Sequence, residues 1–267
     1  MPLLDIAEHQ LFYERSGTGE PLLLIMGMSG TRLTWGEPFL EALRVDFDTV
    51  VYDHRGVGDS PGRPQAFTLA DLADDAVAIL DAVGWDSAHV VGISMGGMIA
   101  QELALRHPER VRTLVLGCTY AGGPGAALTT PEVAGPLFEA MSSGDRERAI
   151  RAAWEANVSA TFAADDEQFR TFHDNALRLR APLPVIQLQL QAIAGHDTSA
   201  RLRDIAAPTL VVHGTEDAML PVANAKAIAD AIPGARLEIL EGIGHLFFWE
   251  EPERSASLVR EHALVSA

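Results

Sequence analysis

The sequence contains a single cysteine, Cys118, among 267 residues. It can form no intramolecular disulfide and offers no pair of thiols to a metal, so a reducing cytoplasm is the expected compartment. Basic residues are also scarce: 20 lysines and arginines stand against 37 acidic residues, for a formal net charge of -17. No basic run interrupts the dispersed acidic residues, and nucleic acids and anionic membrane surfaces are therefore poor partners.

Long apolar runs are missing as well. The longest comparable stretch, residues 22–28, is far too short to span a bilayer. Residues 1–5 have neither the basic region nor the long apolar region of an export signal. We therefore expect a soluble protein that is not exported. Its 267 residues are enough for one large α/β domain, or for such a core with an inserted cap.

Short apolar runs alternate with helix-like segments along most of the chain. Residues 11–14 and 22–26 are expected to be strands that form a hairpin, because the serine and glycines of residues 16–19 favour a turn. Strands alternating with helices predict a mostly parallel sheet covered by helices on both faces. The further strands are expected at residues 48–52, 88–91, 111–116, 209–213 and 236–240.

The helix that is best marked in the sequence follows Thr68. Thr68 and Asp71 have the spacing of a capping box, and apolar residues then recur at helical spacing as far as Gly84. Another helix is expected after the strand at 88–91, ending at Pro108, and another at about residues 222–232.

Residues 121–196 depart from the alternation of strands and helices. They open with a glycine-rich stretch and then carry helix-favouring segments at about 131–141, 146–158 and 166–180, with no strand pattern between them. We expect a helical cap at residues 121–196 over a core made of residues 1–120 and 197–267. In sheets of this class, ligands bind at the carboxyl edge that such a cap would cover.

Gly92-Ile93-Ser94-Met95-Gly96 lies between a strand-like run and a helix-like run. Glycines allow the backbone to close around a serine on a sharp strand-to-helix turn, which lifts the Ser94 hydroxyl out of the sheet. Ser94 is thus a candidate nucleophile. The backbone N–H of Met95, at the start of the following helix, is a candidate donor to a developing oxyanion.

A serine nucleophile needs a base, and the base needs an acid that orients it. The strand at 209–213 leads into Gly214-Thr215-Glu216-Asp217, and the strand at 236–240 leads into a glycine-flanked loop that ends at His245. Asp217 is therefore the candidate acid and His245 the candidate base. Glu216 is an alternative acid that the motif position favours less.

These motifs, with the glycine-punctuated loop at residues 53–60, resemble those of the α/β-hydrolase fold superfamily over nearly the whole chain. Within it the sequence is most similar to enol-lactonases, methylesterases and cofactor-free perhydrolases. The resemblance implies that Ser94 is the nucleophile, that His245 is the general base and then the acid, and that Asp217 orients it.

The resemblance also implies a second oxyanion donor, the backbone N–H of Met28. Many family members have His-Gly after the first buried strand, whereas this chain has Met26-Gly27-Met28. A backbone donor survives a change of side chain, but the change leaves open how the loop is braced.

Other polar residues have simpler interpretations. His54 and His213 are assigned structural hydrogen bonds, and Cys118 the role of an inert small side chain. No histidines have metal-ligand spacing and no G-x-G-x-x-G follows a strand, so the sequence predicts neither a metal nor another cofactor.

The residues proposed to line a substrate pocket come from the expected cap and from the loops around the acid and the base. They are Trp154, Phe162, Phe138, Met219 and Leu246. The arginines that could attract an anionic substrate are Arg32, Arg178 and Arg180.

The predicted function is that of a serine hydrolase that cleaves a carboxylic ester or lactone through an acyl-enzyme. The same residues also serve perhydrolysis and hydrolysis of a C–C bond beside a ketone. A ligand-sensing receptor on the same fold is the alternative from another class. We expect a small uncharged substrate with a small to medium acyl group, and the sequence leaves the natural substrate and the oligomeric state open.

Overall fold

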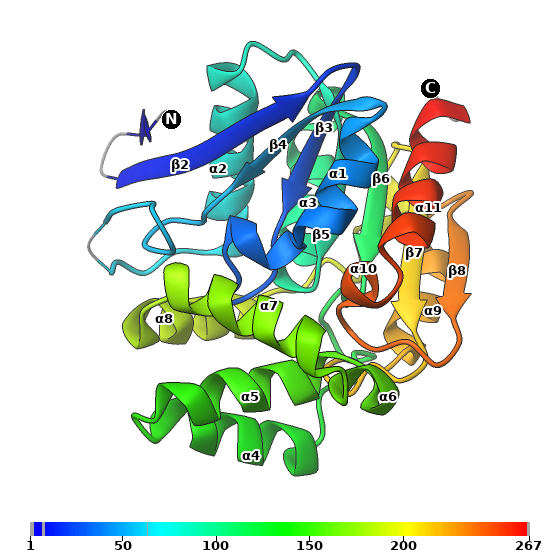
Figure 1. The fold of residues 1–267 in the computed structure, drawn as a ribbon. Helices are drawn as coiled ribbons and strands as arrows, with labels where there is room; N and C mark the ends of the chain where they lie inside the picture. The colour runs from blue at the N-terminus through cyan, green and yellow to red at the C-terminus, as the bar shows by residue number, and fades with distance from the viewer. Residues whose placement is uncertain (1–2, 7–8, 63, 266–267) are drawn as a thin grey trace.

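A computed structural model describes residues 3–6, 9–62 and 64–265. Met1 and Pro2, which begin the segment considered for an export signal, lie outside the described residues. Within these ranges, eight strands form one sheet in the order β1-β2-β4-β3-β5-β6-β7-β8 (Figure 1). The strands are β1 (Leu3–Ile6), β2 (His9–Gly17), β3 (Glu20–Ile25), β4 (Phe47–Tyr52), β5 (Ala88–Ile93), β6 (Val111–Gly117), β7 (Thr209–Gly214) and β8 (Arg236–Leu240).

The sheet is parallel from β4 to β8, and β1 and β2 run antiparallel to their neighbours. The expected hairpin between residues 11–14 and 22–26 is wrong, because β4 lies between β2 and β3. A Cβ on Gly17 would lie 2.2 Å from the Phe47 carbonyl oxygen, so the turn crosses closely over the start of β4. The hairpin that does form joins β1 to β2, with Leu3 opposite Phe12.

Helices cover both faces of the sheet (Figure 1). Alternate residues of a buried strand point to opposite faces, and accordingly Val90 and Val91 belong to two separate apolar clusters. One cluster contains side chains of α2 (Leu69–Ala82), α3 (Met95–Arg106) and α9 (Ala223–Ala231). The other contains side chains of α1 (Glu37–Arg44), α10 (Phe247–Glu250) and α11 (Pro252–Val265), three helices that the sequence interpretation did not include.

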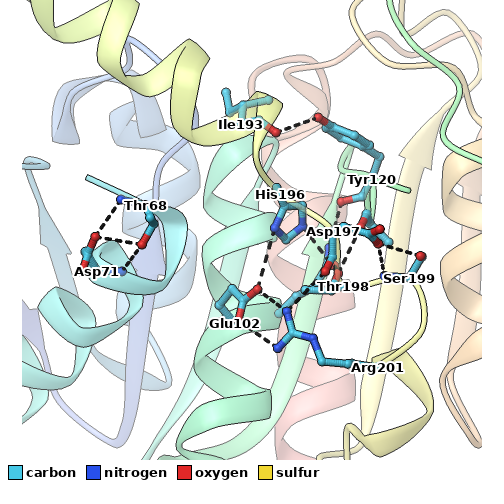
Figure 2. A network of polar contacts seen from close by, with 12 residues as sticks. Thr68, Asp71, Glu102, Tyr120, Ile193, His196, Asp197, Thr198, Ser199 and Arg201 are labelled. Carbon is cyan, nitrogen blue, oxygen red and sulfur yellow. Dashed lines mark hydrogen bonds and ion pairs between the residues drawn. The ribbon is translucent and has the colours of Figure 1, made fainter. Parts of the chain in front are cut away.

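The capping box at the start of α2 is confirmed. The Thr68 N–H donates to Asp71 Oδ2 at 2.7 Å, and the Asp71 N–H donates back to Thr68 Oγ1 at 3.2 Å (Figure 2). The described part of the core also contains the short 3-10 helices η1 (Arg32–Trp35), η2 (Pro108–Arg110) and η3 (Leu202–Asp204). No helix in the described ranges is both long enough and apolar enough to cross a membrane.

A helical insertion lies between β6 and β7, beyond the carboxyl ends of the strands (Figure 1). The expected helical segments correspond to its helices α4, α5 and α7, but α8 was missed because leucine and glutamine alternate over residues 187–190, which is not a helical spacing. The insertion contains α4 (Pro131–Ser142), α5 (Arg146–Asn157), α6 (Ala160–Ala163), α7 (Asp166–Arg178) and α8 (Leu183–Ala194).

The two ends of the insertion meet on α3, as the network in Figure 2 shows. The Thr198 N–H donates to the Ala121 carbonyl oxygen at 2.8 Å, which joins the outgoing chain to the returning one. The Gln101 side chain donates to the Tyr120 carbonyl oxygen at 3.1 Å, and Arg201 pairs with Glu102 at 2.5 Å. Because Gln101 and Glu102 belong to α3, the insertion is anchored to the helix that begins directly after Ser94.

Candidate active site

Ser94 stands on the sharp turn between β5 and α3. Its backbone has φ 56° and ψ -123°. Residues other than glycine rarely adopt this left-handed conformation, which costs about 1–3 kcal/mol. Two hydrogen bonds hold it there: the Ser94 N–H donates to the Gly117 carbonyl oxygen at 2.9 Å, and Thr119 Oγ1 donates to the Ser94 carbonyl oxygen at 2.7 Å. The end of the neighbouring strand β6 and the residues that follow it therefore fix the position of this serine.

The glycines of the elbow are required by close backbone approach. A Cβ on Gly96 would lie 1.9 Å from the Ile25 carbonyl oxygen, and a Cβ on Gly92 would lie 2.3 Å from the Gly96 carbonyl oxygen. Either side chain would push α3 away from the sheet. The glycines of the motif are thus needed because the turn is tightly packed.

Asp217 and His245 meet at the carboxyl ends of β7 and β8. His245 Nδ1 donates to Asp217 Oδ2 at 2.7 Å, and both residues are buried. The other carboxylate oxygen, Oδ1, accepts the N–H groups of Met219 and Leu220 at 2.8 and 2.9 Å. Glu216 is exposed and has no contact of this kind, so the acid beside His245 is Asp217.

His213 is a further neighbour of this carboxylate that the sequence interpretation treated only as structural. Its Nε2 lies 3.0 Å from Asp217 Oδ2 and 2.8 Å from the Leu220 carbonyl oxygen. Since both neighbours are acceptors, Nε2 must carry the proton. Burial alone would raise the pKa of Asp217, but His245, its hydrogen bond to the carboxylate and the nearby His213 ring hold the pKa well below its usual range. The signal for this contact was the four-residue spacing from His213 to Asp217 across a tight turn.

Ser94 and His245 line the same cavity. Within the described residues no hydrogen bond joins the Ser94 hydroxyl to the His245 ring, so the expected contact of roughly 3.5 Å stays a prediction. Hydrogen bonds between nucleophile and base are commonly long in a resting site and tighten when substrate binds. The structure therefore places the acid in contact with the base. The base and the nucleophile both line the same cavity.

The two candidate oxyanion donors come from different elements. Met95 is the first residue of α3, so its N–H has no acceptor within the helix. Met28 follows β3 and lines the cavity beside Ser94. In the described part of the chain, the Met28 N–H makes no hydrogen bond to another protein group. Both assignments stay predictions of role, with a geometry that is compatible with them.

The loop that carries Met28 is braced from three sides. His54 Nε2 donates to the Met26 carbonyl oxygen at 2.8 Å, and burial lowers the pKa of His54, which favours the neutral ring. The Ser29 N–H donates to Gln189 Oε1 at 2.9 Å, a contact from α8 of the insertion. The Arg32 N–H donates to Asp53 Oδ1 at 2.7 Å. These three contacts hold the loop that carries Met26-Gly27-Met28 in place.

Arg32 is not available for contact with a substrate. Its guanidinium is buried and pairs with Asp53 at 2.6 Å, Glu14 at 2.9 Å and Asp59 at 2.9 Å. Three carboxylates already use its donors. Arg178 is exposed and does not line the cavity, whereas Arg180 lines it.

Cys118 also lies close to the acid and base. One ligand atom from each of Cys118, Asp217 and His245 falls within 4.8 Å of the others, a grouping that could suggest a metal. However, the hydrogen bond between Asp217 and His245 already uses both of their facing atoms. Burial raises the pKa of the Cys118 thiol well above its usual range, which disfavours the thiolate that binds metals. The donor set fits a hydrogen-bonded acid–base pair better than a metal centre.

The cavity has two lobes that meet at Ser94 and Met28. The first, the His245 lobe, has a volume of about 250 Å³ and is lined by His245 and by polar side chains of the insertion, including Asn157, Asn175 and Arg180. The second, the apolar lobe, has a volume of about 300 Å³ and is lined almost entirely by apolar side chains. Leu137, Met141, Ile186 and Met219 border both lobes.

Three of the five proposed pocket residues lie on this cavity: Met219 on both lobes, Leu246 on the His245 lobe and Phe138 on the apolar lobe. The prediction that Trp154 and Phe162 line the pocket is wrong, because neither lines a lobe. Both pack inside the insertion instead. Trp154 is fully buried, its ring contacts Phe162, and its Nε1 donates to the Ala163 carbonyl oxygen.

The helical periodicity of α5 explains the position of Trp154. Ala149, Ala153 and Asn157 recur at four-residue spacing and form the face of α5 that lines the cavity. Trp154 follows Ala153 and is therefore turned about 100° around the helix, toward the aromatic side chains of α6, α7 and α10.

Comparison with known proteins agrees with this fold. Residues 20–252 match the family model described as the alpha/beta hydrolase fold. A protein of Azorhizobium caulinodans named as a carbamate hydrolase is 32% identical over 256 residues, covering 95% of this chain and 94% of that protein. Two solved structures are also similar over nearly their full length. A thermophilic esterase from Thermogutta terrifontis is 27% identical, with a TM-score of 0.80 over 97% of this chain and 94% of that chain. An enzyme described as degrading N-acyl homoserine lactones is 30% identical, with a TM-score of 0.78 over 97% of this chain and 99% of that chain.

Proposed function

The chain belongs to the α/β-hydrolase fold family, and from that membership we propose that it is a serine hydrolase that cleaves a carboxylic ester or lactone through an acyl-enzyme. The observation that carries the proposal is the buried Asp217–His245 hydrogen bond, with His245 and the strained Ser94 facing the same cavity. Strain at the elbow and a buried ionised acid are costs that a purely structural turn would not need.

In the proposed reaction the Ser94 oxygen attacks the carbonyl carbon and His245 takes the hydroxyl proton. The N–H groups of Met28 and Met95 stabilise the negative oxygen of the tetrahedral intermediate. His245 then gives its proton to the departing alcohol oxygen, which leaves an ester bond on Ser94. A water molecule, deprotonated by His245, attacks this ester, and the acid leaves as Ser94 regains its proton.

Asp217 contributes by holding the His245 ring in one tautomer. Since Oδ2 accepts the Nδ1 proton, Nε2 is left free to exchange protons with Ser94 and with the leaving group. The donors on Oδ1 keep the carboxylate from rotating. The low pKa of Asp217 keeps it ionised throughout, so the proton stays on His245.

A carbamate is a second candidate substrate, favoured by the relative that is named as a carbamate hydrolase. The same attack on a carbonyl carbon would cleave it. The apolar lobe favours an ester or lactone instead. A small polar carbamate would leave this lobe, with a volume of about 300 Å³, unfilled and its apolar wall without contacts.

Turnover of p-nitrophenyl acetate tests the proposal. We expect multiple turnovers per protein molecule, and a fluorophosphonate that stops the reaction while adding one phosphonyl group to Ser94, as located by peptide mass spectrometry. A single stoichiometric burst would indicate a ligand-sensing receptor. Absence of both ester and lactone turnover, with carbamate cleavage intact, would assign the second candidate.

A further inference from the structure

The apolar lobe reaches from Ser94 to the protein surface. Several of the large apolar side chains that are exposed among the described residues gather along this lobe, where they form an apolar rim. The rim consists of Leu128 at 64% exposure, Phe138 at 59%, Leu183 at 42% and Leu190 at 40%. Isolated apolar side chains on a surface need no explanation, but a group that continues a cavity marks a binding site.

The wall of the lobe carries no charged side chain within the described residues. Its polar side chains include Thr129, Gln187 and the nucleophile Ser94. Thr129 is already engaged, because its hydroxyl donates to the Met219 carbonyl oxygen. The lobe therefore offers dispersion contacts and exclusion of water, and it offers a charged group no compensation for lost hydration.

The position of His245 decides which part of a substrate lies in which lobe, and this step rests on the proposed function. His245 must donate its proton to the departing alcohol oxygen, so the alcohol part lies on the side of His245. His245 lines the His245 lobe and not the apolar lobe. The acyl part, on the other side of the attacked carbonyl carbon, is thereby directed into the apolar lobe.

We propose that the preferred substrate is an ester or lactone with an extended aliphatic acyl chain, which lies along the apolar lobe with its end at the rim. The alcohol part, which in a lactone is the ring carbon that bears the departing oxygen, lies in the His245 lobe, where Asn157, Asn175 and Arg180 provide polar contacts. Because the rim is open to solvent, the lobe does not restrict the acyl chain to a short length. This differs from the small to medium acyl group that the sequence led us to expect.

The size of the effect follows from burial of methylene groups. Each methylene removed from water favours binding by a factor of about three to four, and this gain appears in kcat/KM when the chain is held in the transition state. The p-nitrophenyl esters of acetate, butyrate, hexanoate and octanoate provide a series with one leaving group. We expect kcat/KM to rise along the series, with the octanoate at least about tenfold above the acetate.

A matched pair of substitutions locates the chain. Ala134 on α4 lines the apolar lobe only, and Ala153 on α5 lines the His245 lobe only. Ala134→Phe should fill the apolar lobe and lower the ratio of octanoate to acetate kcat/KM at least about tenfold. Ala153→Phe adds the same side chain on the other lobe and should leave that ratio within about twofold of the wild type. A melting curve for each variant checks that both are folded.

The outcomes separate this inference from the proposed function. Wild-type protein that turns over neither esters nor lactones would contradict the proposed function itself. Turnover of acetate with a flat or falling chain-length series would contradict only the acyl-chain assignment. An equal loss for all four esters in Ala134→Phe would also contradict it. If the flat series came with self-association that Leu190→Ser abolishes, the rim would be assigned to a second copy of the chain.

Discussion

The two sides of the cavity hold their side chains in different ways. On the sheet side, all six residues of β7 are buried, and the fully buried Asp217 side chain has donors on both carboxylate oxygens. On the insertion side, α7 buries no residue, α4 buries only Ala140, and Phe138 is 59% exposed. The sheet side fixes polar atoms by hydrogen bonds, while the insertion lines the apolar lobe with side chains that make few directional contacts.

This difference separates chemistry from selectivity. A proton transfer requires donors and acceptors at hydrogen-bond distance, which only a densely packed and satisfied environment maintains. Recognition of an aliphatic chain requires only apolar area, so loosely packed helices are sufficient for it. Changes on the sheet side should therefore alter the rate for every substrate, and changes on the insertion should alter either selectivity or stability.

The largest expected effect is that of Ser94→Ala. It should lower kcat for p-nitrophenyl acetate at least about a thousandfold, because it removes the covalent route entirely. Ser94 lines the cavity and its hydroxyl makes no hydrogen bond among the described residues, so the circular dichroism spectrum should not change. Activity above about a hundredth of the wild type in a folded variant would disprove the assignment of the nucleophile.

An intermediate effect is expected for His213→Phe, which removes the polar contact of Nε2 with Asp217 while keeping a flat ring. Loss of this contact to a charged group corresponds to a fall in kcat of about tenfold to a hundredfold for all esters. His213→Gln, whose amide can donate in the same direction, should recover part of the activity.

His262→Phe is the matched control for His213→Phe. His262 is also buried, and its Nε2 donates to the Pro208 carbonyl oxygen at 3.1 Å, away from the acid. The control should lose stability with less than about a threefold change in kcat. Equal losses of kcat in the two phenylalanine variants would show that His213 acts only through packing.

The smallest effect on activity is expected for Trp154→Phe in the insertion. Loss of the hydrogen bond to Ala163 and of part of the ring should lower the free energy of unfolding by about 1–2 kcal/mol in urea titrations. Because Trp154 lies behind the cavity wall, the ratio of octanoate to acetate kcat/KM should not change. A changed ratio of octanoate to acetate kcat/KM at unchanged stability would show that Trp154 does contact the substrate. It would also weaken the distinction between the sheet side and the insertion side of the cavity.

Most elements of the fold could be predicted from short patterns in the sequence. The strand runs, the Thr68–Asp71 capping box and the glycines around Ser94 all describe what the backbone does within a few residues. The hairpin prediction failed because pairing of β2 with β4 depends on where β4 inserts, which no local pattern encodes. The same limit applies to Trp154, whose direction depends on which neighbours α5 meets.

Local sequence patterns were enough to specify the turn that presents Ser94 and to place Asp217 and His245 after successive strands, because steric limits on the backbone act between near neighbours. Packing of the folded chain was needed to bring His213 close to the Asp217–His245 pair, to brace the Met28 loop with His54 and Gln189, and to divide the cavity into two lobes. Those features join residues that are far apart in the chain or depend on how separate elements pack, and the free energy that selects them comes from burial over the whole molecule.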